Sequence, residues 1–426
     1  MKKIILFIPL FFNVLICFSQ EQSFLKLNRG EIETIFLEQN LELIAEQMNI
    51  SIADAEIIQA RLWTNPELSI DEVSFWSTQA QRDFFFDDIP DAPNTRQFTI
   101  ELSQMIRTAG KRRKDVAVQT VARDIAIQEF GETLRELRTE LRQSINEILY
   151  LQAFEKVLSE QVAVLERLVD AHERQARIGN FSTSELLRLQ ASSLEIENEL
   201  NQLKIELNSQ LRILKSLLHL PPTANIVIVS SEADDKDVIV PTLQDLYLLA
   251  MENRPDMRMQ RLQTEFYTKT LRYEQAQRVP DITVSAYYDR FDGIFPNYVG
   301  FGLSFDLPIF DRNQGNIRAA RLSIEQSHFL ERQVQNEIFN EIAEAFRNYE
   351  QSLRFYRRMS GSALFSDLNN MLEVYTRNLL NRNISLLEFI DFMEAYQTSK
   401  QIFLETQMAV RNNFEELQYT VGIDIR

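Results

Sequence analysis

The sequence predicts a mainly α-helical protein with two β-hairpins, in which a unit of helix, strand, strand, long helix and helix occurs twice. Three observations predict this fold class. Proline, the strongest helix breaker, is absent from residues 94–220 and again from 309–426. Between Leu134 and Val169 the apolar positions advance in ten steps over 35 residues, a period of about 3.5 that is typical of left-handed coiled coils. Two stretches of alternating apolar and polar residues precede each long helical region, as in half-buried strands.

The first residues have the pattern of a secretory signal peptide, which we assign to residues 1–19. Lys2 and Lys3 precede an apolar run over 4–17, and Ser19 supplies a small residue for cleavage. The single cysteine, Cys17, lies inside this leader, so we expect the mature chain to contain no thiol and no disulfide. The alternative is that Cys17 is acylated and becomes the first residue of a lipoprotein.

Residues 20–220 form the first predicted repeat. Its opening helix covers 31–62 and stops at Asn65-Pro66. The following elements are two strands at about 66–76 and 97–106 and a long helical hairpin over 111–220, whose first helix runs to residue 175 and whose turn contains Gly179. The basic run at the start of that helix, 111–114, is interpreted as a solvated helix start, with binding of lipid head groups or nucleic acid as the alternative.

Residues 221–241 are read as a linker or small equatorial segment, and residues 242–426 repeat the earlier pattern. The elements are a helix over 243–277 that restarts at Pro255, two strands at about 280–290 and 298–307, and a helical hairpin over 313–421. Short sequences correspond between the halves: Leu102-Ser103 with Leu303-Ser304, and Phe181-Ser182 with Ile384-Ser385. We therefore infer an internal duplication.

Composition excludes several classes of function. The net charge is −17, and loss of Lys2 and Lys3 with the leader makes it −19, so nucleic acid is not an expected partner. The three histidines, His172, His219 and His328, lack the spacing of metal ligands. Without a glycine-rich loop or a usable thiol, we expect no enzyme, no cofactor and no bound metal.

The strands carry the signs of an outer membrane. Each pair has one apolar face and one face of small or polar residues, and aromatic residues gather at the strand ends, as in strands that face lipid on one side and water on the other. The aromatic residues expected to form a girdle in outer-membrane lipid are Phe75, Trp76, Tyr287, Tyr288, Phe291 and Tyr298. The alternative for such a strand pair is an ordinary surface hairpin.

Four strands cannot close a membrane barrel, because a bilayer tolerates no open sheet edge and small barrels need about eight strands. We therefore expect oligomerisation, and three copies would give a 12-stranded β-barrel with a trimeric α-barrel of twelve helices. A helix over 111–175 is about 100 Å long at 1.5 Å per residue. It exceeds the thickness of a bilayer, so the helices are expected to project into the periplasm.

This organisation resembles the TolC family of outer-membrane efflux proteins over essentially the whole mature chain. The residues that carry the resemblance are Asn65-Pro66-Glu67-Leu68, Gly179-Asn180-Phe181-Ser182, Asn253-Arg254-Pro255-Asp256, Gly302-Leu303-Ser304 and the stretch from Leu307 to Gly315. Within the last stretch, Phe310 to Gly315 is most similar to the branch that serves heavy-metal pumps of the cobalt-zinc-cadmium type. The resemblance implies a homotrimeric passive duct that docks onto a periplasmic adaptor (membrane fusion) protein and an inner-membrane RND-type pump.

The resemblance also implies roles for the two hairpin tips. The adaptor would dock at Gly179, Asn180, Phe181, Ser182, Asn381, Arg382 and Asn383. The periplasmic aperture would be lined by Glu185, Glu388 and Asp391; the last two are three apart and so share a helical face. Three copies would bring six carboxylates from Glu388 and Asp391 into one cation-favouring ring. The alternative is that these are solvated acids on an amphipathic helix.

A second class of function stays open on the sequence alone, namely a soluble periplasmic coiled-coil adaptor or scaffold whose strands form a small surface sheet. The duplicated strand pairs count against it. The sequence does not identify the exported substrate, the partner pump, the fate of Cys17 or the resting state of the aperture.

Overall fold

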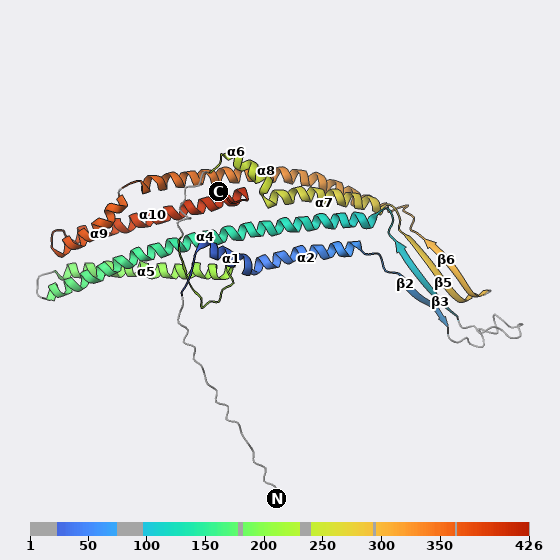
Figure 1. Cartoon of the computed structure of the whole chain (residues 1–426), viewed down its shortest axis with the longest axis horizontal. Coiled ribbons are helices and arrows are strands. Elements are labelled where there is room, and N and C mark those ends of the chain that lie inside the picture. Colours follow the sequence, from blue (N-terminus) through green and yellow to red (C-terminus); the bar gives the residue numbers. More distant parts are fainter. Residues whose placement is uncertain are drawn as a thin grey trace, which may run out of the picture. The chain divides into compact units, whose positions relative to one another are not determined.

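The computed structural model describes residues 24–74, 97–177, 182–230, 240–292, 295–362 and 364–425, and it is mainly helical (Figure 1). The helices are α1 (Arg29–Gln39), α2 (Leu41–Arg61), α4 (Lys111–Arg177), α5 (Thr183–Leu217), α6 (Leu243–Asn253), α7 (Pro255–Gln277), α8 (Gln314–Ser360), α9 (Leu364–Leu380) and α10 (Leu386–Val421). The strands are β1 (Phe24–Leu27), β2 (Glu67–Ser74), β3 (Gln97–Ile106), β4 (Asn225–Ile228), β5 (Ile282–Asp292) and β6 (Phe295–Ser304). The predicted leader over 1–19, with Cys17, lies outside the described residues. Within the described residues, no helix combines the length and apolar character that crossing a bilayer requires.

Helix α4 is the longest element, and its heptad pattern explains why it forms. It contains 67 residues, with no proline to break it and with Gly131 as its only glycine. Leu141, Ile148 and Leu158 of the predicted apolar stripe are fully buried, so the period of about 3.5 does mark one packed face. At 1.5 Å per residue this helix is about 100 Å long.

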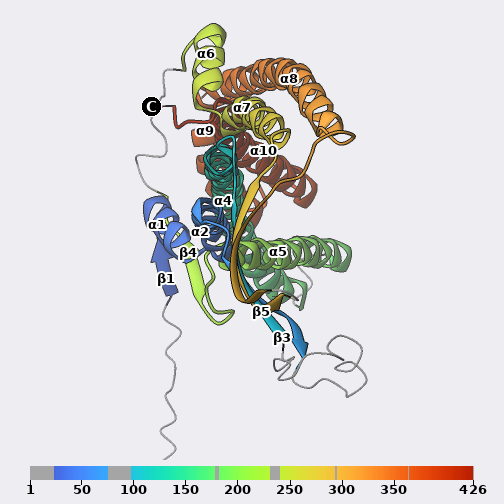
Figure 2. The same ribbon diagram turned by 90° about the vertical axis from the view of Figure 1, so that its right-hand side faces the viewer.

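The chain divides into two compact units, and each takes segments from both sequence repeats. The first comprises the described parts of 1–39, 144–236 and 370–401, and it includes a parallel pairing of β1 with β4 (Figure 2). The second comprises the described parts of 40–143, 237–369 and 402–426, and its core joins α6, α7, α8 and the end of α10. The repeats are therefore interleaved in space and are not separate compact bodies.

The second unit carries a four-stranded antiparallel sheet in the order β2-β3-β5-β6 (Figure 1). β3 and β5, one from each repeat, form the central pair, with eight residue pairs from Thr99↔Asp289 to Ile106↔Ile282. β2 and β6 are the two edges, and no described strand pairs with the outer side of either one. The sheet therefore ends in two rows of unpaired backbone groups.

The register sorts the side chains into one apolar and one polar face. One cross-strand row is Leu68, Leu102, Ala286 and Phe301, and the next row on the opposite face is Ser69, Glu101, Tyr287 and Gly300. The apolar face is uncovered in the single chain: Leu68 is 63% exposed, Val299 61%, Phe301 83% and Leu303 65%. On the polar face Gly300 is required by a close approach, because a Cβ there would lie 2.4 Å from Cζ of Tyr287.

Several boundaries differ from the sequence-based expectation. The helix expected over 31–62 is two helices that meet at Asn40, whose side chain accepts a hydrogen bond from the backbone N–H of Leu43 (3.0 Å) and starts α2. The second long helix stops at Ser360, and α9 begins four residues later. β5 and β6 span 282–292 and 295–304 where 280–290 and 298–307 were predicted, so this hairpin has a shorter loop than expected.

Candidate functional site: hairpin tips, sheet faces and the arginine network

The first hairpin tip is described only from Ser182 onward; Gly179, Asn180 and Phe181 lie outside the described residues. Ser182 is the N-cap of α5, and its Oγ accepts a hydrogen bond from the backbone N–H of Ser184 (3.3 Å). Glu185 follows in the first turn and is exposed to solvent. A negative charge at this position is favourable, since the positive end of the helix dipole lies there.

The second tip ends α9 with a Schellman motif over Asn381, Arg382 and Asn383. The N–H of Asn383 donates to the carbonyl of Asn378 (2.9 Å), and the N–H of Arg382 donates to that of Leu379 (3.0 Å). Arg382 takes the left-handed conformation, with φ 60°. Glycine is the usual residue at this position of a Schellman motif, and an arginine occupies it here.

Glu388 caps the helix that follows this turn. Its carboxylate accepts hydrogen bonds from the backbone N–H (2.8 Å) and Oγ (2.9 Å) of Ser385, while the N–H of Glu388 donates to Oγ of Ser385 (3.2 Å). This is a capping box. The hydrogen bonds from Ser385 lower the pKa of Glu388, which therefore stays ionised at neutral pH. Asp391 lies one turn further along α10 and is exposed.

The predicted aromatic girdle is divided between the two faces of the sheet. Tyr288 lies on the apolar face, where its ring is 5.9 Å from that of Phe98. Tyr287 and Tyr298 lie on the polar face, with their rings 5.9 Å apart. Phe291 belongs to β5, whereas Phe75 and Trp76 lie outside the described residues.

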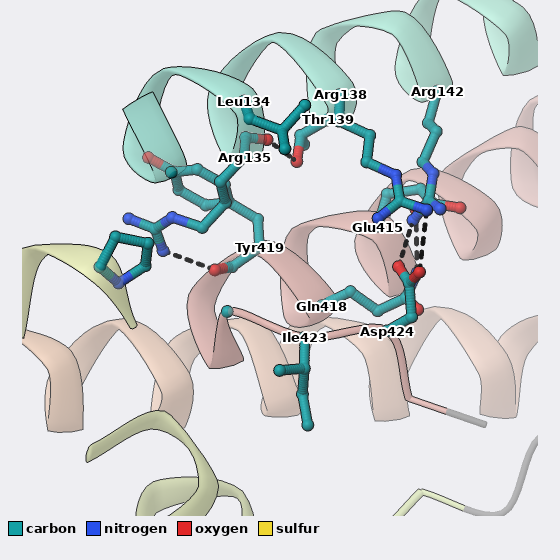
Figure 3. Close-up of a pocket in the computed structure, with 13 residues that line it drawn as sticks. Leu134, Arg135, Arg138, Thr139, Arg142, Glu415, Gln418, Tyr419, Ile423 and Asp424 are labelled. Atoms are coloured by element: carbon teal, nitrogen blue, oxygen red, sulfur yellow. Dashed lines mark hydrogen bonds and ion pairs between the residues drawn. The ribbon is translucent and has the colours of Figure 1, made fainter. Parts of the chain in front are cut away.

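A network of arginines joins α4, α7, α8 and α10 within the second unit, and Figure 3 shows its part between α4 and the end of α10. Arg254 and Asp256 belong to the motif quoted for the family resemblance, whereas the arginines of α4 were not predicted as site residues. Arg254, 4% exposed, precedes α7 and binds Asp256 through Nε (3.0 Å) and Nη2 (2.6 Å). Its Nη1 donates to Glu341 (2.6 Å) and to the carbonyl of Thr420 (3.0 Å). One guanidinium group thus fixes the start of α7 against α8 and the end of α10.

The same network holds the C-terminal segment after α10. Asp424 accepts bonds from Arg142 (2.7 Å) and Arg138 (2.9 Å), and Arg142 also binds Glu415 (3.1 Å). The chain turns into this segment at Gly422, which has φ +84° and lies against the backbone of Arg254. The pocket between these groups has a volume of about 140 Å³.

Ionisation in the network follows from burial opposed by pairing. Burial alone acts to raise the pKa of Asp256, but hydrogen bonds and charge from Arg254, with the charge of Arg135, hold it below its ordinary value of 3.8. Burial alone would lower the pKa of Arg254. The carboxylates of Asp256 and Glu341 outweigh this effect and raise the pKa above its ordinary value. Within the described residues, no group of three or more His, Cys, Asp or Glu side chains is arranged to hold a metal ion.

Comparison with known proteins gives consistent matches. A family described as "Outer membrane efflux protein" matches residues 35–218 and 246–356. The cobalt-zinc-cadmium resistance protein CzcC of Cupriavidus metallidurans is 24% identical over 283 residues, which cover 66% of this chain and 63% of CzcC. The crystal structure of CusC has a TM-score of 0.72 at 16% identity, covering 93% of this chain and 92% of CusC. The CmeC outer membrane channel of Campylobacter jejuni has a TM-score of 0.71 at 14% identity, covering 92% and 85%.

Gly422→Ala is expected to destabilise the protein. The left-handed conformation alone costs a residue with a side chain about 1–2 kcal/mol, and the new Cβ would lie 3.0–3.3 Å from three atoms of Arg254. Chemical denaturation followed by helical circular dichroism measures the change. Gly315→Ala in α8 is the control, since no atom outside its chain neighbours and the nearby helix backbone lies within 4 Å of its Cβ position. Equal midpoints for the two variants would contradict the assigned role of Gly422.

The stability of the protein is expected to fall at acid pH through Asp256. Because its pKa is lower in the folded protein than in the unfolded chain, the stabilisation is fully present above about pH 4 and is lost as the pH falls through the lower, folded pKa. Unfolding free energies measured from pH 6 to pH 2 should therefore decline less steeply in Asp256→Asn. Asp367→Asn, an exposed change in α9, should retain the parent slope, and a parent slope in both variants would argue against the role of Asp256.

Proposed function

The chain belongs to the outer membrane efflux protein family, and from that premise we propose that it is the outer-membrane channel of a tripartite efflux system, a passive duct with no catalytic centre. The observation that carries the proposal is the family match together with a sheet whose apolar face is uncovered. Transport energy would come from an inner-membrane RND-type pump, reached through a periplasmic adaptor protein. A soluble coiled-coil adaptor, the alternative considered from the sequence, is disfavoured by membership of this family.

The geometry of the sheet favours a homotrimer. Four strands with two open edges cannot stand in a bilayer, where each unpaired backbone group costs several kcal/mol. Pairing β6 of one copy with β2 of the next satisfies both edges, and three copies give the twelve strands proposed for the barrel. The arrangement is head-to-tail and closes into a ring.

The apolar face of the sheet would contact outer-membrane lipid, and the polar face would line the duct. Phe301 and Val299 then face hydrocarbon, with Tyr288 at the lipid boundary. Tyr287 and Tyr298 lie on the polar face and would instead face the water-filled lumen. The gate would lie at the hairpin tips, with Glu185, Glu388 and Asp391 favouring cations and with residues 179–182 and 381–383 contacting the adaptor.

Heavy-metal cations are the substrate class that we propose. The sequence similarity to CzcC supports this choice, although the matched region spans only 63% of that relative. Acidic residues at the narrow end of a duct also suit cations, since a ring of carboxylates lowers the electrostatic barrier to positive charge.

Phe301→Lys is expected to impair assembly in the membrane. A lysine on the lipid face of an outer-membrane strand costs about 2–4 kcal/mol near the bilayer midplane, so the yield of oligomer in the outer-membrane fraction should fall severalfold. Ser103→Lys, on the polar face of β3, should leave the yield near that of the parent. Similar yields of the two variants would overturn the assignment of the faces.

The double change Glu388→Gln/Asp391→Asn is expected to reduce cation selectivity without unfolding the tip. Glutamine can replace glutamate in a capping box, so the change removes charge and retains the cap. Reversal potentials in planar bilayers under a KCl gradient should shift towards zero. Glu373→Gln, a change of an exposed acid in α9, serves as the control. A shift of the same size in this control, or no shift in the double variant, would refute the acidic gate without contradicting the proposed duct.

A further inference from the structure

We propose that the chain binds the phosphate group of a membrane lipid in a pocket of four arginines at the end of the sheet where the strands join the helices. The inference rests on the proposed function, which places this end of the sheet at the periplasmic surface of the outer membrane. The arginines are Arg278, Arg312, Arg318 and Arg321.

The four residues come from three neighbouring segments and line one cavity. Arg278 follows the last turn of α7, Arg312 lies in the segment after β6, and Arg318 and Arg321 lie in the first turns of α8. The open cavity has a volume of about 680 Å³, and the other lining residues are Ile309, Phe310, Gln314 and Ile317. Space for a phosphate group is therefore available.

The positive charge of this pocket is not compensated within the part of the chain that the structure describes. None of the four guanidinium groups forms an ion pair there, whereas the buried Arg254 and Arg142 each bind two carboxylates. Two acids of the neighbouring cavity, Glu274 and Asp311, instead accept hydrogen bonds from Asn313. Arginine presents a rigid set of donors that matches phosphate oxygens, so this cluster favours a phosphate ligand.

The start of α8 adds to the same field. Asn313, the N-cap, has φ 55° and makes no capping hydrogen bond through its side chain, and the first turn of this 47-residue helix contains no acidic residue. Its first backbone N–H groups and the positive end of its dipole are thus available to an anion.

The apolar rim distinguishes a lipid from a free anion. Exposed apolar residues follow β6 along the chain: Phe305 is 52% exposed, Leu307 is 68% exposed and Phe310 is 92% exposed. The last of them, Phe310, lines the arginine pocket itself together with Ile309 and Ile317. Inorganic phosphate makes no use of such a rim, whereas a phospholipid places its acyl chains on the apolar side and its phosphate among the guanidinium groups.

The test measures binding of fluorescently labelled phosphatidylglycerol to the full-length protein purified in detergent. Labelled diacylglycerol is the phosphate-free probe, and inorganic phosphate is the competitor. Arg318→Gln/Arg321→Gln should weaken phosphatidylglycerol binding about tenfold. The control, Arg332→Gln/Arg347→Gln, removes two other exposed arginines of α8 with the same loss of charge and should retain parent affinity. Phe310→Ser should weaken the binding of phosphatidylglycerol and leave the inhibition constant of inorganic phosphate unchanged.

Three results would overturn the proposal. Equal weakening in both arginine pairs would indicate attraction to charge without a site. If inorganic phosphate competes with an inhibition constant equal to the dissociation constant of the lipid, and Phe310→Ser has no effect, the pocket is a site for the free anion. If the parent does not bind the lipid and the Arg318→Gln/Arg321→Gln variant loses its oligomer in native mass spectrometry, the arginines pair with carboxylates of a second copy.

Single-channel conductance of the same samples separates the two levels of inference. If the protein conducts but shows no preference for phosphatidylglycerol over diacylglycerol, the lipid site is refuted and the proposed channel stands. If the protein does not conduct, the proposed channel function is refuted, and with it the premise of the lipid site.

Discussion

A buried guanidinium group that cannot lose its proton constrains the whole second unit. Arg254 is almost inaccessible to solvent, and an unpaired charge in that position would cost several kcal/mol. The structure meets the requirement with Asp256, Glu341 and the carbonyl of Thr420, which belong to three different helices. Satisfying one side chain therefore fixes the directions of α7, α8 and the end of α10 together. The sheet is attached to these helices, because β5 follows α7 and β6 precedes α8 in the chain.

Much of the fold could be predicted because periodicity is a local property of the sequence. The apolar spacing of α4 and the alternation in β3, β5 and β6 depend only on neighbouring residues. Features that depend on distant partners were missed. β1 is four residues long and exists through pairing with β4, about 200 residues away. The break after Ser360 was also missed, because the proline-free pattern continues across it.

The candidate sites were predictable to a lesser degree, for two physical reasons. Residue type alone does not determine the face of a strand: Tyr287 and Tyr288 are adjacent and therefore point to opposite sides, which only the register resolves. Networks and pockets assembled from several segments leave weak local signals. The arginine pocket combines α7, the segment after β6 and α8, and Lys111, read as part of a solvated helix start, is 3% exposed and pairs with Asp281 at 2.8 Å. One signal was readable in advance, since Ser385 and Glu388 have the spacing of a capping box.

The central pairing of β3 with β5 holds the two sequence repeats together independently of the peptide chain between them. Eight residue pairs of that ladder, the Lys111–Asp281 ion pair and the bonds from Arg142 to Glu415 and Asp424 all cross from one repeat to the other. Covalent continuity through 221–241 is thus not required to keep the halves together. A single proteolytic cut in that segment would leave two fragments that remain bound as a complex.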